Sequence, residues 1–320
     1  MGTVRNIHER EIAAPAAEVG ALLDRLSGPD DPLWPSPGWA AMRFDRPLGV
    51  GARGGHGPIR YEVTEYEPGR RVRFDLDSPG EGFHELTIEP LDGARCRVRH
   101  VLEVRWRGAD RLLWPTGIRP IHDAMIEEVF DNMERAAAHG PARAVRWSPW
   151  VRLLNRLLWP RAETVEPPRA ARLLAAAVDR PGYRDAYRMA LWPGQPRDPA
   201  AWSGILRDAF PVLAREGGEL LLDVNTAGLT ARASILIEPG EAGGQGSEGY
   251  EGHKGREGHE GYVTLSTAVA AESLRARLYW GVVRRVHPVM ARAMLRRTHR
   301  ALALAAPDAA TRAAGRATIC

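Results

Sequence analysis

The most restrictive feature of this sequence is a set of four alternating apolar and polar runs in its first half. They span residues 61–67, 72–77, 83–89 and 95–106, and turn-forming residues such as Pro68-Gly69 and Asp92-Gly93 separate them. Successive residues of a strand point to opposite faces, so short alternating runs joined by tight turns favour an antiparallel sheet. The sequence therefore predicts an antiparallel meander, with a further strand at residues 6–12 before it.

After Gly108 the apolar residues recur with a helical period instead. An amphipathic helix that ends an antiparallel meander can pack along one face of the sheet and leave a cavity between them. The predicted fold class is α+β, with a curved antiparallel sheet wrapped on a long C-terminal helix. The apolar face of that helix is formed by Ile118, Ile121, Met125, Val129 and Met133, and Asp123, Glu127, Asp131 and Glu134 lie largely opposite.

The second half repeats this order in a shorter form. Runs at 184–193, 219–224, 229–238 and 262–269 are predicted strands, and the basic, apolar stretch Arg277–Leu302 is the predicted closing helix. Pro288 removes one helical hydrogen bond, so a kink is expected near His287. The two closing helices share paired residues: Arg111/Arg277, Trp114/Trp280, His122/His287 and Met125/Met290. We expect Val283, Val286, Met290 and Met294 to face the second sheet, and two tandem helix-grip modules to result.

A chain of 320 residues suggests about two domains. We expect a ligand-binding domain at 1–138, a Pro- and Trp-rich linker at 139–168 and a second domain at 169–320. The linker contains WSPWVRLLNRLLWPR, which fits either a helix that docks the two domains together or a membrane-surface helix. A glycine at every third position of 246–261 predicts a flexible, disordered insertion at 239–261. GxGxxG at 49–54 precedes a predicted strand, which indicates a hairpin and not a nucleotide-binding loop.

Three segments of the first half resemble a known superfamily. They are EREIAAPAAEVGALL, IRYEVTEYEPGRRVRFDL and the closing helix through Glu134. Residues 5–138 resemble the START and birch-allergen-like (SRPBCC) superfamily, especially its polyketide cyclase/dehydrase-like bacterial members. The resemblance implies a helix-grip fold and carries no catalytic signature. Residues 169–303, through RDAYRMALWPG, ASILIEPG and the closing helix, resemble an uncharacterised bacterial domain associated with the same superfamily.

Composition and the absence of known motifs indicate where the protein is located and which partners it lacks. All but one of the 44 Lys and Arg residues are arginine, a bias typical of GC-rich coding and weak evidence for nucleic-acid binding. Two distant cysteines make no disulfide framework, and the N-terminus is polar and charged, so a cytoplasmic protein is expected. The sequence contains no HExxH, P-loop, CxxC or nucleophile elbow. We therefore expect no cofactor, no metal site and no nucleic-acid partner.

Alternation places a few polar residues on the apolar face of the sheet. His100 shares its face with Val98 and Leu102, and His84 shares its face with Leu86 and Ile88. An apolar pocket with a few placed polar groups is typical of a ligand site. Each histidine could instead only hydrogen-bond a neighbour. The predicted ligand-binding residues are Tyr61, His84, Val98, His100, Leu102 and Met125, with His84 and His100 as candidate acid/base groups.

Three functions fit these features. The first is binding or transport of a small hydrophobic, lipid- or polyketide-like ligand in the first module. The second is a cyclase or dehydratase that acts on a similar ligand with the cavity histidines. The third is an adaptor at a membrane surface, because Arg292, Arg296 and Arg300 are expected to form an exposed stripe that could meet anionic lipid or simply be solvated.

Overall fold

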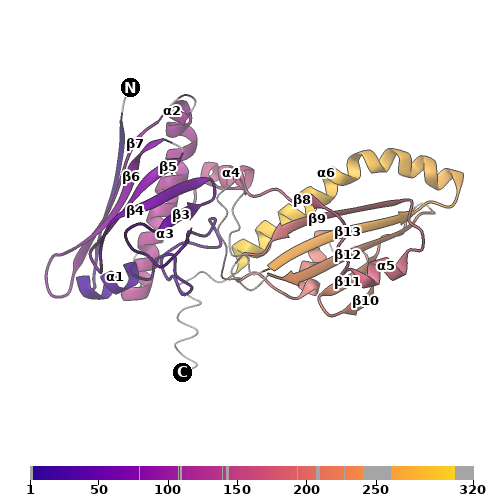
Figure 1. Ribbon diagram of the computed structural model, residues 1–320, viewed down its shortest axis with the longest axis horizontal. Coiled ribbons are helices and arrows are strands. Elements are labelled where there is room, and N and C mark those ends of the chain that lie inside the picture. Colours follow the sequence, from indigo (N-terminus) through magenta and orange to yellow (C-terminus); the bar gives the residue numbers. More distant parts are fainter. Residues whose placement is uncertain are drawn as a thin grey trace. The chain divides into compact units, whose positions relative to one another are not determined.

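The computed structural model describes residues 3–306 apart from 79, 107, 109, 139, 142–143, 193, 207–209, 227 and 241–260. The described residues form two compact units, unit 1 up to Leu158 and unit 2 from Trp159 to Ala306 (Figure 1). The predicted glycine-rich insertion lies almost entirely outside the described residues.

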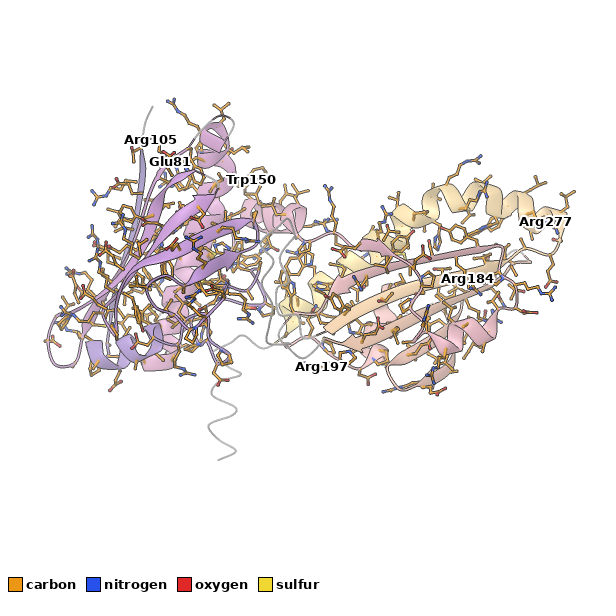
Figure 2. All side chains as sticks on the ribbon, viewed as in Figure 1. Glu81, Arg105, Trp150, Arg184, Arg197 and Arg277 are labelled. Carbon is orange, nitrogen blue, oxygen red and sulfur yellow. The ribbon has the colours of Figure 1, made fainter. Side chains whose placement is uncertain are left out.

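Unit 1 contains the antiparallel sheet that the alternating runs predict. Its seven strands follow the order β1-β7-β6-β5-β4-β3-β2, and every neighbouring pair is antiparallel. Glu81 and Arg105, which Figure 2 labels, are register partners at the end of β6 and β7. The strands are β1 (Val4–Ile12), β2 (Arg43–Phe44), β3 (Arg53–His56), β4 (Ile59–Glu67), β5 (Arg71–Ser78), β6 (Glu81–Pro90) and β7 (Cys96–Arg105).

The closing helix of unit 1 lies along one face of this sheet (Figure 1). A short helix α2 (Asp110–Leu113) and a π-helical turn η1 (Trp114–Ile118) lead into α3 (Arg119–Ala137), and α1 (Ala16–Leu23) packs near its other end. Met125, Val129 and Met133 are buried as predicted, whereas Ile118 and Ile121 are half-buried. The α+β fold with a sheet on a long C-terminal helix is confirmed.

The acidic side of α3 does not simply face solvent. It lies against β1, whose Arg10 donates to Asp131 at 2.6 Å and to Glu127 at 2.6 Å. Asp131 is only 1% exposed. The helical period alone placed these carboxylates opposite the apolar face, but a wide sheet covers more than one side of the helix. Positive groups on β1 compensate the buried charges there.

The segment after α3 folds back onto unit 1. Helix α4 (Pro149–Leu158) packs on α3, and its Val151 is part of the unit 1 core. Trp150, labelled in Figure 2, donates from Nε1 to the carbonyl of Thr116 at 2.6 Å. Asn155 donates to the carbonyl of Gly38. This piece of the predicted linker is therefore a helix that packs on unit 1.

The GxGxxG motif lies in a hairpin. Gly51 adopts a φ of +84°, which a side chain disfavours, and its N–H donates to the carbonyl of Val63. A Cβ at Gly54 would lie 1.9 Å from the carbonyl oxygen of Arg43 on β2. These glycines therefore serve a tight turn and a close strand approach.

Unit 2 is a six-stranded antiparallel sheet of order β10-β11-β12-β13-β9-β8 with helices on both faces. Helix α5 (Arg172–Ala177) packs with one group of buried residues, and the long α6 (Leu274–Ala305) and the 3-10 helix η2 (Pro199–Leu206) pack with another. The strands are β8 (Glu163–Val165), β9 (Tyr183–Ala190), β10 (Val212–Glu216), β11 (Glu219–Asp223), β12 (Thr230–Pro239) and β13 (Gly261–Ala270).

The buried face of α6 differs from the predicted one. Of the four predicted residues, Val283 and Met294 are half-buried, and Met294 packs against the core of unit 2. Val286 and Met290 are 53% and 55% exposed, whereas Ala291, Leu295 and His299 are buried. The prediction assumed that the bulky apolar residues face the sheet. The face that packs on the sheet also contains Ala276, Ala291 and Ala303, whose small side chains let the helix approach the strands, and Val286 and Met290 point outward.

The predicted arginine stripe is only partly exposed. Arg296 donates to the carbonyls of Trp159 and Pro160, and Arg300 stacks over the Trp159 ring. Arg292 is exposed and donates to Thr164 Oγ1. The expectation of a fully exposed stripe was therefore wrong, because the segment at the start of unit 2 covers two of its three members.

No helix in the described part of the chain is both long enough and apolar enough to cross a membrane.

Candidate functional site

A small apolar cavity lies inside unit 1, between α3 and the sheet. Its volume is about 40 Å³. Side chains from the strands, from α3 and from the segment between α1 and β2 form its wall. The lining residues are Leu26, Trp34, Met42, Tyr61, Phe74, His84, Leu86, His100, Met125, Ile126, Val129 and Phe130. Tyr61, His84 and His100 are the polar groups among them.

Four of the six predicted ligand-binding residues line this cavity: Tyr61, His84, His100 and Met125. Val98 is fully buried in the core of unit 1 but is not among the lining residues. Leu102 packs with Val104, Trp106 and Trp114 in a separate cluster. The strand alternation placed both residues on the inner face, and their positions along β7 place them outside the cavity wall.

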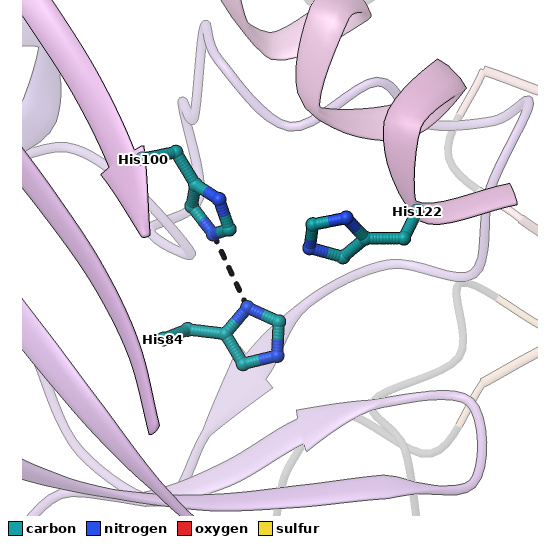
Figure 3. A group of neighbouring side chains, drawn as sticks. All are labelled: His84, His100 and His122. Atoms are coloured by element: carbon teal, nitrogen blue, oxygen red, sulfur yellow. Dashed lines mark hydrogen bonds between the residues drawn. The ribbon is translucent and has the colours of Figure 1, made fainter. Parts of the chain in front are cut away.

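Three histidines lie close together, His84 and His100 at the cavity wall and His122 beside them (Figure 3). His84 comes from β6, His100 from β7 and His122 from α3. Nδ1 of His84 lies 3.1 Å from Nε2 of His100, so one ring donates to the other. The centroid of the His122 ring lies 5.1 Å from that of His100 and 5.4 Å from that of His84. We call these three residues the histidine triad.

Several nitrogens of the triad lack a hydrogen bond. Among the described residues, neither ring nitrogen of His122 has a partner, and Nδ1 of His100 has none. The Asp123 carboxylate lies 3.8 Å from Nδ1 of His122, which is too long for a hydrogen bond. Buried polar atoms are normally paired, because an unpaired one keeps the full cost of its desolvation. The triad is therefore a polar site that the protein alone does not satisfy.

Burial keeps the triad neutral. It lowers the pKa of His84 and of His100 well below the ordinary value of 6.5, and it lowers the pKa of His122 as well. The nearby His56 follows the same rule, because burial lowers its pKa to about 3. At neutral pH each of these rings carries a lone pair on one nitrogen.

Tyr61 and His56 form a second polar pair beside the triad. Nε2 of His56 lies 2.9 Å from the Tyr61 hydroxyl, and burial raises the pKa of Tyr61. The Tyr61 ring packs edge-on against His84, with centroids 5.4 Å apart. The hydroxyl therefore remains protonated at neutral pH.

The positive charge near the site belongs to His8 on β1. Burial alone would lower its pKa, but hydrogen bonds to Asp123 and Glu127 raise it to about 9. The Nδ1–Glu127 and Nε2–Asp123 distances are 2.7 and 3.1 Å. Because both nitrogens are occupied by carboxylates, His8 stays an imidazolium bound into the wall of unit 1.

His122, His56 and His8 were missed as site residues by the sequence reasoning. The helical period contained a signal for His122, because it precedes Met125 by three residues and so shares the inner face of α3. His56 lies in the very short strand β3, where alternation is too brief to assign a face. His8 is recognisable only once β1 is known to pair with β7 and to contact α3.

Comparison with known proteins finds one family model that matches most of unit 1. Residues 5–138 match the model of the family described as polyketide cyclase / dehydrase and lipid transport, so the resemblance noted for this half is confirmed. No curated protein matches the chain. The family match does not extend beyond residue 138.

Solved structures with a similar fold are distant in sequence. A solution NMR structure from Thermobifida fusca is 20% identical and covers 45% of this chain and 100% of that chain, with a TM-score of 0.34. Norcoclaurine synthase from Thalictrum flavum, in complex with dopamine and hydroxybenzaldehyde, is 13% identical. The match covers 44% of this chain and 90% of that chain, with a TM-score of 0.35. CalU16 from Micromonospora echinospora is 16% identical, and the match covers 48% of this chain and 83% of that chain, with a TM-score of 0.32.

The seven-stranded sheet, the closing helix and the family match describe the same part of the chain. Residues 5–138 thus match the family described as polyketide cyclase / dehydrase and lipid transport.

Proposed function

We propose that unit 1 binds or carries a small, mainly hydrophobic molecule in the cavity between α3 and the sheet. The observation that supports this most is the composition of the cavity wall, in which nine apolar side chains surround three polar ones, Tyr61, His84 and His100. Apolar walls hold the body of a ligand, and a few polar groups fix its orientation. The family is one of hydrophobic-ligand binding and cyclase-type proteins, which agrees with this proposal.

The size of the cavity limits how it is filled. Typical pockets for small molecules enclose ~300–1,000 Å³, whereas this cavity has about 40 Å³. A lipid- or polyketide-like ligand must therefore displace side chains. Met42 and Met125 are suited to this, because methionine is unbranched and repacks easily. Met42 and Trp34 also lie in the long irregular segment between α1 and β2, which we propose moves when the ligand enters.

The electrostatics favour binding over acid/base catalysis. A general base works best when its pKa lies near the working pH. Burial holds the pKa of His84 and of His100 well below 6.5, which makes both weak bases. As neutral rings they are suited to accept or donate a hydrogen bond to a ligand's polar group. The cyclase or dehydratase alternative requires that ligand entry raise these pKa values.

The proposal is tested by displacement of a fluorescent fatty acid or naphthol probe from the full chain. Val129→Phe fills the cavity from α3 and should weaken probe binding by ~10-fold or more, because the ring occupies the ligand's space. Ile121→Phe is the matched control on the same helix, since Ile121 is half-buried and does not line the cavity. Equal probe affinity in the wild type and in Val129→Phe would place the ligand elsewhere.

A membrane-surface role is a second candidate because of an exposed stripe on α6. Leu278, Val282 and Val286 are 67%, 65% and 53% exposed, and they recur at intervals of four residues. The exposed Arg277, which Figure 2 labels, and the exposed Arg285 flank the stripe. An apolar face bordered by arginines fits an anionic lipid surface.

Sedimentation with vesicles of anionic or neutral lipid tests the second candidate. Binding should require anionic lipid and should be lost in Val282→Glu, whereas the exposed Val212→Glu on β10 is the control. Binding that is equal on both vesicle types, or that survives Val282→Glu, would refute a role of this stripe.

A further inference from the structure

We propose that His84, His100 and His122 form a binding site for a divalent transition-metal ion such as Zn²⁺. One ring nitrogen of each lies within 4.8 Å of the other two, and the three side chains come from two adjacent strands and the facing helix (Figure 3). Imidazole nitrogen is a preferred ligand of Zn²⁺, Cu²⁺, Ni²⁺ and Fe²⁺. Neither family membership nor the proposed hydrophobic ligand is needed for this inference.

The spacing suits tetrahedral coordination. With Zn–N bonds of ~2.0–2.1 Å, two tetrahedral ligands lie roughly 3.3 Å apart. Nδ1 of His84 and Nε2 of His100 are already 3.1 Å apart. With every pair within 4.8 Å, small rotations of the side chains bring the third nitrogen to the required distance.

The hydrogen-bond pattern supports the same conclusion. Among the described residues, both nitrogens of His122 and one of His100 are buried without a partner. His84 and His100 are linked to each other, which holds their nitrogens at ligand spacing. Bound metal would use an unpartnered nitrogen of His122 and would replace the hydrogen bond between His84 and His100, whose proton would move to the other nitrogen of its ring.

A second group of possible ligands is less suitable. His8, His122 and Asp123 also lie within 4.8 Å of one another. His8, however, already contacts Asp123 and Glu127 through both nitrogens, and Asp123 also accepts from Asn6. Metal would have to break these hydrogen bonds. The triad requires only that the single hydrogen bond between His84 and His100 be replaced.

Three protein ligands leave a fourth coordination position. Closed structural zinc sites use four protein ligands, whereas sites that bind substrate use three and keep one position for water or ligand. Because His84 and His100 line the cavity, a bound ion would lie at the cavity wall. The class of ligand that fits such a site is a mainly apolar molecule with one oxygen or sulfur donor.

The test is a titration of the EDTA-treated full chain with Zn²⁺ and, separately, with Co²⁺ and Mg²⁺. We expect one Zn²⁺ per chain, a visible absorption band of four-coordinate Co²⁺, and no response to Mg²⁺. His84→Gln and His122→Leu should each weaken Zn²⁺ binding by ~100-fold or more, since even residues that only orient a ligand contribute ~10–100-fold. Zn²⁺ should also raise the Tm of the wild type but not that of the two variants.

Two control variants test whether other histidines bind the Zn²⁺. His287→Gln changes a histidine of unit 2, and a double substitution of His253 and His259 by Gln removes those of the glycine-rich insertion. Both should bind as the wild type does. Absence of Zn²⁺ uptake by the wild type would overturn the proposal, and so would binding that survives His84→Gln but is lost in His8→Gln or in the double variant.

The same proteins distinguish this proposal from the hydrophobic-ligand proposal. Val129→Phe should lose the fluorescent probe and still bind Zn²⁺, because Val129 is two turns along α3 from His122. Probe binding without metal uptake would leave the cavity function standing and remove the metal site. Far-UV circular dichroism of each variant confirms that it is folded before it is titrated.

Discussion

Glu128 on α3 is expected to make the stability of unit 1 fall as the pH rises. Its two carboxylate oxygens accept the indole N–H groups of Trp39 and Trp147, whose rings pack with centroids 4.9 Å apart. Burial raises the pKa of Glu128 from 4.5 to about 7, although the two indole donors oppose this; the nearby Asp131 raises the pKa further and Arg135 lowers it.

The sign and size of the effect follow from linkage. Since the folded state holds the Glu128 proton more tightly than the unfolded chain, its contribution is fully present below pH 4.5. It is lost as the pH rises through about 7. The increase in the pKa of Glu128 corresponds to on the order of 3 kcal/mol of unfolding free energy, at ~1.4 kcal/mol for each pKa unit.

Glu128→Gln isolates this contribution, because glutamine cannot ionise. We expect the free energy of unfolding of the wild type, relative to the variant, to fall by on the order of 3 kcal/mol between pH 5 and 8. Urea unfolding at a series of pH values measures it. The ionisation of His8 is common to both proteins and cancels in the difference. A difference that is constant with pH, or that rises, would refute the assignment.

Three further predictions concern stability. Asp131→Ala leaves Arg10 without its most buried partner and the Val145 N–H without an acceptor, so the free energy of unfolding in urea should fall by ~3–5 kcal/mol. Glu134→Ala is the control with a smaller expected effect, because Arg10 then keeps Asp131 and Glu127. An equal loss of stability in the two variants would contradict this prediction. In EDTA, His122→Leu should leave the Tm unchanged or raise it, because both nitrogens that it removes are buried and unpaired. The gain in the free energy of unfolding should be at most ~1–3 kcal/mol. A marked decrease in Tm would reveal a partner such as bound water. A chain that ends at residue 158 should have a higher Tm and bind less of a hydrophobic dye than one that ends at 138, which lacks Trp147 and Val151; equal behaviour would show that α4 contributes nothing to the core.

Local patterns determined much of unit 1 because each depends on near neighbours in the chain. The alternation along β7 correctly assigned Cys96, Val98, His100, Leu102 and Val104 to the inner face, since strand geometry alone decides which residues share a face. The helical period likewise identified Met125, Val129 and Met133 as the buried side of α3. Turn residues then located the ends of β4, β5, β6 and β7 to within a few residues.

The outward apolar stripe of α6 shows where local patterns fail. This helix carries apolar residues on more than one side, so its period is compatible with several buried faces. The sheet of unit 2 selects the face with Ala276, Ala291 and Ala303, because small side chains allow close approach. Which face of α6 is buried is therefore determined by its packing against the strands.

The histidine triad depends even more on tertiary structure. His84 and His100 become neighbours through the register of β6 and β7, which pairs His84 with Leu102 and Leu86 with His100. His122 joins them only because α3 crosses that part of the sheet, and the same packing sets Asp131 against Arg10. Single residues on separate elements have no shared period or spacing in the chain. Their meeting is decided by how the helix lies on the sheet, which the sequence pattern of neither element contains.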